Sequence, residues 1–478
     1  MEHPPFNAAK ASRYVNGLAI IASLGGFLFG YDTAVISGTI RFVTDQFHLS
    51  ASGTGWYVSS ALLGCLIGVA FAGILSDRYG RKKVLLLSGM FFGLSAIGCA
   101  FALGFVDLVI CRLAGGLGIG IASMISPLYI SELSPAAKRG RLVALYQFAI
   151  TIGILSSYFC NAGLLKLSQS GFLHDTSGVL YKIMVSEVWR IMLGTSFIPA
   201  FSFLLLLLFV PESPRWLVLK GNTGKAFRIL NRIMPGTQSS EEIKQIQFNL
   251  EAEAGGLGMI LKGNFRLPLV IGITLAFLTQ VSGINVIIYY GPKILEEAGI
   301  PISKALGGQV IIGIVNVLFT LIAIWKIDQL GRRPLLLAGV TGIISSLIII
   351  GFLFNINSTN TILLLCFILL FIGCFAFSYG PVIWVLLSEI FPMKIRGKAM
   401  SLATFSLWIG TALVGQFTPI LLEGIGPSGT FWLFAILTSP AIFLAIKVIP
   451  ETKGRSLEEI ERYWMNKETK SALDEIEQ

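Results

Sequence analysis

The feature that most constrains this chain is a series of apolar runs, each long enough to cross a bilayer as a helix. Such a helix needs about 20 apolar residues, and the 478 residues contain twelve candidates. Only 13% of the residues are charged, against about 25% in a soluble domain. The sequence therefore predicts an all-α membrane protein with 12 transmembrane helices, at about residues 15–38, 55–76, 84–105, 108–130, 142–164, 189–210, 267–292, 306–325, 335–354, 362–387, 399–422 and 430–449.

The distribution of Lys and Arg predicts the orientation. Because twelve is even, both termini lie on one side, and the segments on that side hold 29 of the 36 Lys and Arg. The loops on the other side hold only Arg41, Lys166, Lys182, Lys293 and Lys304. The positive-inside rule then predicts a multi-pass protein of the cell (plasma or inner) membrane with both termini in the cytosol. It also explains the net charge of +10 without nucleic acid, since no contiguous basic face is present.

One long polar interruption divides the chain into two halves. We predict a cytosolic N-terminus over 1–14, a six-helix half over 15–210, a cytosolic linker over 211–266, a second six-helix half over 267–449 and a cytosolic segment over 450–478. In the linker, Ile243, Ile246 and Leu250 recur at helical spacing among charged residues. This pattern favours cytosolic amphipathic helices.

Three charged motifs appear once in each half, which predicts that the halves are repeats in the same orientation. Each motif places acids and bases at helix ends, where charge-assisted bonds could form when the cytosolic face closes. A solvated turn would explain any single cluster, but not three clusters duplicated at matching places. The predicted cytosolic gating network is Asp77, Arg81, Glu132, Arg139, Glu212, Asp328, Arg332, Glu389, Arg396 and Glu451.

Several longer motifs carry a family resemblance. They are the turns at 77–82 and 328–333, Pro-Glu-Ser-Pro-Arg-Trp at 211–216, Gln-Val-Ser-Gly-Ile-Asn at 280–285 with Tyr-Tyr at 289–290, Gly380-Pro381 with Trp384, and Pro-Glu-Thr-Lys-Gly at 450–454. With them the chain resembles a sugar porter of the major facilitator superfamily, similar to bacterial sugar:proton symporters and facilitative glucose transporters. The resemblance implies a major facilitator fold of two six-helix halves that rock around a midplane sugar site, and a transporter rather than an enzyme.

Asp32 and Arg112 are ionisable residues that stand inside spans, well apart from the cytosolic motifs. Such residues are costly in a membrane and are usually functional. An arginine beside a buried carboxylate favours the charged form, whereas desolvation without it favours the neutral form. A conformational cycle could thus load and release a proton, although a static ion pair is an alternative. The resemblance implies the proton-coupling role, because proton-coupled sugar porters carry an acid in this Gly-Tyr-Asp context.

Polar and aromatic side chains on apolar spans are the candidate sugar contacts. Amides both donate and accept hydrogen bonds, as sugar hydroxyls do, and aromatic faces can cover the C–H groups of a sugar ring. Three positions depart from the family pattern, because Thr279 stands where many sugar porters have a glutamine, and Ile154 and Leu407 stand where some relatives present an amide. The expected substrate-binding set is Phe29, Gln147, Ile154, Thr279, Gln280, Asn285, Tyr290, Asn316, Trp384 and Trp408. Gly380-Pro381 should break or kink its helix just before Trp384.

These features predict a proton-coupled monosaccharide symporter, for a pentose or a hexose, that works by alternating access as a monomer in the lipid bilayer. A facilitative uniporter of the same fold and a non-transporting sugar receptor are the alternatives. No cofactor and no metal site are expected, because the cysteines show no CxxC spacing and the three histidines are isolated. A nucleotide-binding P-loop motif is also missing from the sequence, which argues against an ATP-driven pump.

Overall fold

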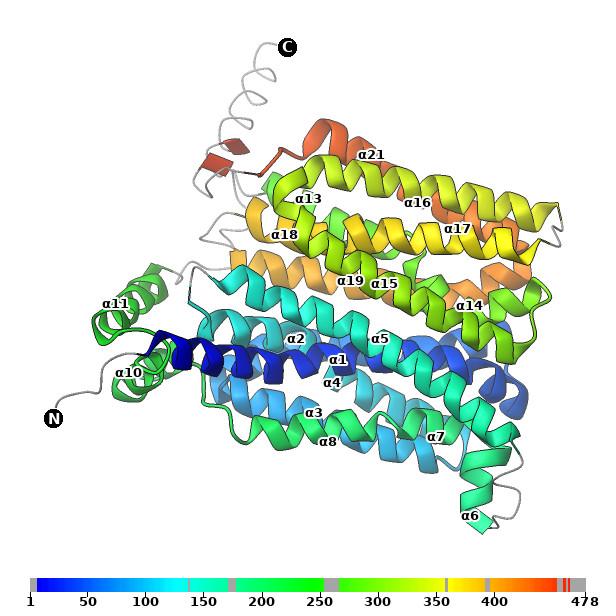
Figure 1. Cartoon of the computed structure of the whole chain (residues 1–478), viewed down its shortest axis with the longest axis horizontal. Helices are drawn as coiled ribbons and strands as arrows, with labels where there is room; N and C mark the ends of the chain where they lie inside the picture. The colour runs from blue at the N-terminus through cyan, green and yellow to red at the C-terminus, as the bar shows by residue number, and fades with distance from the viewer. Residues whose placement is uncertain are drawn as a thin grey trace. The chain divides into compact units, whose positions relative to one another are not determined.

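The computed structural model describes residues 7–135, 138–170, 178–252, 266–356, 360–391, 396–453, 459–460 and 463–464, and shows helices and no strand among them. It contains 12 helical segments long and apolar enough to cross a membrane, and each overlaps one predicted run (Figure 1). The prediction of an all-α membrane protein with twelve spans is confirmed. The first six spans are α1 (Ala8–Phe47), α2 (Ala51–Tyr79), α3 (Arg81–Phe101), α4 (Phe105–Leu133), α5 (Arg139–Gln169) and α7 (Trp189–Gly194) with α8 (Phe197–Leu207).

Three of the second six spans are built from more than one helix. The six spans are α13 (Arg266–Gln280) with α14 (Ile284–Glu297), α15 (Ile302–Leu330), α16 (Arg332–Asn355), α17 (Thr361–Cys374) with α18 (Gly380–Ile390), α19 (Arg396–Gly424), and α20 (Gly426–Thr438) with α21 (Pro440–Phe443). A π-helix, Phe375–Tyr379, joins α17 to α18, and another, Leu444–Val448, follows α21. A short helix α6 (Gly178–Tyr181) and a π-helix, Lys182–Ser186, precede α7.

The chain folds into two compact units, Met1–His48 with Ser60–Ala254, and Leu49–Ser59 with Gly255–Gln478. The first turns of α2 therefore belong to the second unit. Their contact with α19 explains this membership, since Ser59 donates a hydrogen bond to Gln416 Oε1 at 2.6 Å and Gln416 Nε2 donates to Ser52 O at 3.2 Å. A Cβ at Gly55 would lie 2.2 Å from the carbonyl oxygen of Gln416, so only glycine permits this approach.

In the first unit, α1 and α5 pack closely through glycines. A Cβ at Gly30 would lie 1.9 Å from the carbonyl oxygen of Ile150, and a Cβ at Gly153 would lie 2.1 Å from that of Phe27. The missing side chains let the two backbones approach, as small residues do in membrane helix pairs. This packing fixes the face of α1 that carries Gly30, and so directs Asp32 toward the other side of the helix.

The linker contains the predicted amphipathic helices, α9 (Pro214–Leu219), α10 (Thr223–Leu230) and α11 (Gly236–Ala252). Their apolar faces form a small core of Leu217, Val218 and Ala226, against which Ile243 and Ile246 pack. Figure 1 shows α10 and α11 at the same end of the unit as the start of α1. The side chain of Leu250 and residues 253–265 lie outside the described part of the chain.

Two spans of the second unit are interrupted near their middle. At Gly380-Pro381, where the sequence predicts a break or a kink, a π-helix ends at Tyr379 and α18 continues from Gly380. Proline lacks the N–H that an α-helix needs, and a wider π turn before it accommodates the change in register. The other interruption was not predicted: α13 ends at Gln280, and α14 begins after Gly283, which has a φ of 87°.

Candidate functional site

Asp32 and Arg112 form a buried ion pair in the first unit. Asp32 lies on α1 and Arg112 on α4, and the two residues are only 7% and 4% exposed. Nη1 of the arginine lies 3.3 and 3.2 Å from the two carboxylate oxygens. The sequence analysis expected these residues to pair, and the structure brings them together. An ion pair at this depth carries a large desolvation cost, so it is weak evidence for stability and stronger evidence for function.

The remaining candidates of the first unit lie on the helices that pack against each other beside this pair. Phe29 is half-buried on α1, one turn before Asp32, and Gln147 is half-buried on α5. Ile154 is buried on α5, two turns after Gln147. The structure therefore places one amide and one aromatic ring in positions that are neither sealed in the core nor fully exposed.

Gln280 and Asn285 form a polar cluster at the interruption between α13 and α14. Asn285 Nδ2 donates a hydrogen bond to Gln280 Oε1 at 2.7 Å. In a continuous helix, residues three and four apart are neighbours but residues five apart are not. The interruption at Gly283 therefore creates this contact. Thr279 is buried beside it and donates to Leu275 O at 2.8 Å, so its hydroxyl hydrogen is already bound.

Thr411 belongs to the same cluster, although the sequence analysis missed it. From α19, its hydroxyl lies 3.1 Å from Gln280 Oε1 and 2.9 Å from Leu407 O. The one signal in the sequence was its spacing of three from Trp408, which puts both residues on one face of α19. A hydroxyl in an apolar span usually bonds to its own backbone, so this spacing alone carried little weight.

The other candidates of the second unit differ in exposure. Trp384 is half-buried on α18, just after the π-helix, while Trp408 is 2% exposed and Asn316 on α15 is 8% exposed. Tyr290 is fully buried, and its hydroxyl donates to Gly415 O at 2.6 Å. The Tyr290 hydroxyl is thus bound to the backbone of α19, which makes its ring rather than its hydroxyl the part that could shape a site.

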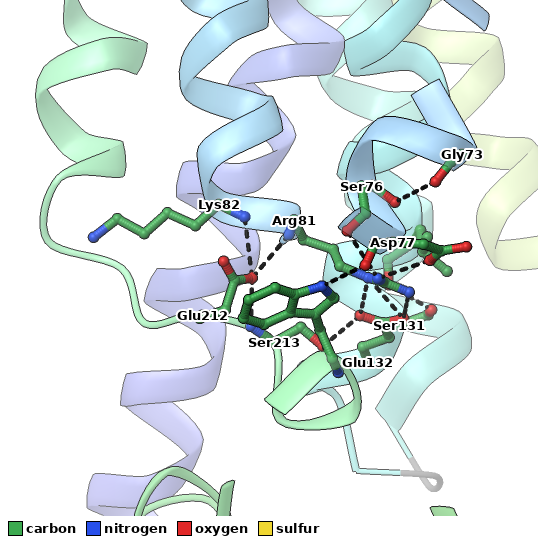
Figure 2. Close-up of polar contacts among 11 residues, drawn as sticks. Gly73, Ser76, Asp77, Arg81, Lys82, Ser131, Glu132, Glu212 and Ser213 are labelled. Atoms are coloured by element: carbon green, nitrogen blue, oxygen red, sulfur yellow. Dashed lines mark hydrogen bonds and ion pairs between the residues drawn. The ribbon is translucent and has the colours of Figure 1, made fainter. Parts of the chain in front are cut away.

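A dense charged cluster lies at one end of the first unit (Figure 2). Arg81 binds Glu132 through two bonds, Nη2 to Oε1 and Nε to Oε2, both 3.0 Å long, and its Nη1 lies 3.0 Å from Asp77 Oδ1. Glu212 Oε1 accepts from the backbone amides of Arg81 and Lys82 at 2.9 and 3.1 Å. A Cβ at Gly80 would lie 2.3 Å from Glu212 Oε2, so the turn requires glycine.

The second unit repeats the contacts of the arginine and of the two glutamates. Arg332 binds Glu389, with Nη2 2.9 Å from Oε1 and Nε 3.2 Å from Oε2. Glu451 accepts from the backbone amides of Arg332 and Arg333, each at 3.0 Å. Ser213 in the first cluster and Thr452 in the second each donate to the corresponding glutamate, Glu132 or Glu389. The sequence analysis did not identify these two hydroxyls.

The rest of the predicted gating network is placed differently. Arg139 donates from Nε to the carbonyl oxygen of Ser131 at 3.1 Å rather than to a carboxylate. The side chains of Asp328 and Arg396 lie outside the described part of the structure. Each acid–base pair described above joins segments of one unit, so the clusters lock helix ends together within that unit.

Comparisons with known proteins agree with this arrangement. Residues 18–464 match the family model described as "Sugar (and other) transporter". The arabinose-proton symporter of Bacillus subtilis is 40% identical over 462 residues, which are 96% of this chain and 97% of that protein. The D-xylose-proton symporter of Escherichia coli is 37% identical, with the same coverage of both chains.

Solved structures show the same fold. A proton:xylose symporter of the major facilitator superfamily, bound to 6-bromo-6-deoxy-D-glucose, aligns with a TM-score of 0.80 and 36% identity, over 95% of this chain and 99% of that one. A partially occluded inward-open xylose transporter from E. coli aligns with a TM-score of 0.81 and 34% identity, over 93% of this chain and all of that one. The fold is therefore that of a major facilitator transporter. This multi-pass membrane protein belongs to the sugar transporter family.

Proposed function

We propose that this protein is a proton-coupled monosaccharide symporter, in which Asp32 carries the transported proton. The buried Asp32–Arg112 pair is the observation that supports this best, because an acid and a base are held together at 3.2 Å inside a lipid-embedded unit. Relatives named as sugar-proton symporters add support, with identities of 36–40% over nearly the whole chain.

The coupling would follow from the geometry of this pair. While Arg112 stays beside Asp32, the carboxylate keeps its charge, since its counter-ion is in place. When a change of conformation separates them, the desolvated carboxylate takes up a proton. Re-forming the pair then releases the proton to the side that is open at that moment. Protonation is thereby tied to conformation, as symport requires.

Sugar recognition would rest mainly on the amide cluster of the second unit. Oε1 of Gln280 accepts from Asn285 Nδ2 at 2.7 Å and lies 3.1 Å from the Thr411 hydroxyl, contacts that restrain the amide, whose nitrogen would donate to a sugar hydroxyl. Asn285, Asn316 and Trp384 would add further polar and aromatic contacts. A pentose or a hexose is the substrate class, and relatives named for arabinose, D-xylose and galactose mark the sugars to test.

We further propose that both termini lie on the cytosolic side of a cell membrane and that the protein acts as a monomer. The excess of Lys and Arg on that side supports the orientation. The two charged clusters then lie at the cytosolic end of their units, where they would hold helix ends together when that face is shut.

The decisive experiment compares energised uptake with sugar exchange in reconstituted vesicles, using labelled arabinose, xylose, glucose and galactose. Wild type should accumulate its sugar under an inward proton gradient and lose the accumulation when a protonophore is added. Asp32→Asn removes the titrating group but keeps its size and hydrogen bonding. We therefore expect Asp32→Asn to abolish accumulation. Counterflow, in which labelled sugar enters vesicles preloaded with unlabelled sugar, should remain largely intact.

Asp107→Asn is the matched control, because Asp107 lies on α4 with Arg112 but is exposed and bonds only to the Gly104 amide among the contacts described. It should accumulate sugar as wild type does. If wild-type vesicles fill to the same level with and without a proton gradient, the protein is a uniporter. If no sugar of the panel shows counterflow, the assignment to monosaccharides is wrong.

A further inference from the structure

An exposed apolar stripe runs along α15 in the second unit. Leu318, Ile322 and Trp325 recur at spacings of four and three, so they lie on one face of the helix, and they are 51%, 41% and 68% exposed. On a helix that crosses a bilayer, a row of large exposed apolar side chains is lipid-facing surface. The stripe ends at Trp325, the type of residue that marks the boundary between lipid tails and headgroups.

Two lysines converge where this stripe ends. Lys326 Nζ lies 4.1 Å from the centroid of the Trp325 ring and 2.9 Å from Gln329 Oε1. Lys453 approaches the same residue from beyond the last span, with Nζ 2.6 Å from the carbonyl oxygen of Gln329. A helix C-terminus attracts cations through its dipole. Two ammonium groups on one residue repel each other, which makes the place favourable for an anion.

The first unit differs from this arrangement. The matching stripe on α2, Ile67, Phe71 and Ile74, is followed by no aromatic residue and lysine pair like Trp325 and Lys326. In the last turn of α2, the carbonyl oxygen of Asp77 accepts from the neutral indole N–H of Trp216 at 3.0 Å. The pairing of two lysines at the end of an apolar stripe is therefore a feature of the second unit.

The carboxylates described at this turn already have partners. Glu451 accepts from the backbone amides of Arg332, Arg333 and Lys453, and Glu389 binds Arg332 and Thr452. Among the described side chains, no carboxylate pairs with the ammonium group of Lys326 or of Lys453, so an anionic ligand can supply a counter-charge there. The ligand must also match the apolar stripe that leads to them.

We propose that Lys326, Lys453 and Trp325 bind the headgroup of an anionic phospholipid. The phosphate lies between the two ammonium groups, the Trp325 indole packs against the glycerol region, and the acyl chains lie along Ile322 and Leu318. The site is part of the second unit alone and does not depend on which sugar is carried. Each lysine is expected to strengthen binding about fivefold, as basic residues near an anionic surface do.

Native mass spectrometry of the full-length protein in detergent tests this site. The probes are dioleoyl phosphatidylglycerol and, for comparison, dioleoyl phosphatidylcholine with the same chains. Wild type should bind one phosphatidylglycerol molecule more tightly than phosphatidylcholine. The Lys326→Gln/Lys453→Gln variant should lose about 25-fold in affinity for phosphatidylglycerol, and Lys326→Gln alone about fivefold.

The control is Lys225→Gln/Lys244→Gln, which removes two exposed lysines of α10 and α11 and changes the net charge equally. It should bind phosphatidylglycerol as wild type does, and thermal melting verifies that every variant is folded. Equal losses in the two double variants, or no preference of wild type for phosphatidylglycerol, would overturn the site. Inorganic phosphate at millimolar concentration should not compete, and displacement of the lipid by phosphate would show a site for soluble anions instead.

Discussion

Gln280 illustrates how a single residue can organise a polar site inside an apolar span. Its Oε1 accepts from Asn285 on the following helix and from Thr411 on α19. These contacts restrain the amide, and in the proposed site its nitrogen would donate to a sugar hydroxyl. A ligand then meets a donor that is already oriented, so little side-chain entropy is lost on binding.

Gln280→Ala is expected to weaken sugar binding at least tenfold, and Asn285→Ala likewise. Removing either amide leaves buried partners without a hydrogen bond, at a cost of about 1–3 kcal/mol for each group. Calorimetric titration of the purified protein measures the change. Gln245→Ala truncates an exposed glutamine of α11 and should bind sugar as wild type does. If affinity survives both site substitutions, the sugar binds elsewhere.

Residue types explain which parts of this cluster were predictable. Amides in apolar spans stand out in a sequence, so Gln280 and Asn285 were identified, as were Asp32 and Arg112 among the few buried charges. Hydroxyls do not stand out, because most of them bond to the preceding turn of their own helix, as Thr404 does to Met400 O and Thr438 does to Phe434 O. Thr411 bonds both to its own helix and to Gln280, and only the fold reveals the second contact.

The interruption between α13 and α14 depends on one glycine. Gly283 has a φ of 87°, a conformation that other residues adopt only with strain, and a Cβ there would also lie 3.2 Å from the Phe434 ring. The run from 267 to 292 is mostly apolar, so its length predicted a span but not the break within it. The Gly380-Pro381 pair was a stronger signal, and a π-helix interrupts the α-helix directly before it.

Gly283→Ala is therefore expected to lower the free energy of unfolding by about 1–2 kcal/mol and to weaken sugar binding as well. The second effect follows because the break is what brings Asn285 to Gln280. Gly299→Ala is the control, since Gly299 has a φ of 85° at the end of α14, and a Cβ there would meet nothing within 4 Å. It should be destabilised to a similar extent in thermal melting while its sugar affinity is unchanged. Equal sugar affinity in Gly283→Ala and Gly299→Ala would show that the interruption between α13 and α14 does not contribute to sugar binding.

The turn between α15 and α16 should make stability depend on pH. Burial alone would raise the pKa of Glu451, but backbone hydrogen bonds from Lys453, Arg332, Arg333 and Thr452 outweigh it and lower this pKa below its usual value of 4.5. Because the folded-state pKa is the lower one, the stabilisation is complete above pH 4.5 and is lost as the pH falls through the folded value. Thermal melting between pH 7 and pH 4 should show a smaller loss of stability for Glu451→Gln than for wild type, and parallel curves would contradict this assignment.

On the scale of the whole molecule, the internal repeat was the most informative part of the sequence. The duplicated motifs predicted two halves, and the structure contains two compact units with matching clusters, Arg81 with Glu132 and Arg332 with Glu389. The membership of Leu49–Ser59 in the second unit could not be predicted in this way. It rests on the contact of α2 with Gln416, which lies more than 350 positions away in sequence, and no local pattern encodes such a contact.

If the two clusters face the cytosol as proposed, charge reversal in either cluster should open that face of the transporter. In Glu132→Lys or Glu389→Lys an ammonium group would face the guanidinium of Arg81 or Arg332, so the helix ends would separate instead of locking together. A coupling of about 1–3 kcal/mol corresponds to a 5- to 150-fold change in the population of the open state. The reactivity of single cysteines placed at cytosolic positions measures this change. Glu423→Lys, an exposed acid near the other end of α19, should react as wild type does.

The spacing of these clusters along the chain also sets the order in which they can form during synthesis. Glu132 accepts a hydrogen bond from the hydroxyl of Ser213, which lies 81 residues later in the chain. At a synthesis rate of about 5–20 residues per second, Ser213 is added roughly 4–16 s after Glu132. All residues of the first cluster have been synthesised once Trp216 has been added, before any residue of α13 exists. The first cluster can therefore form before most of the second unit is synthesised.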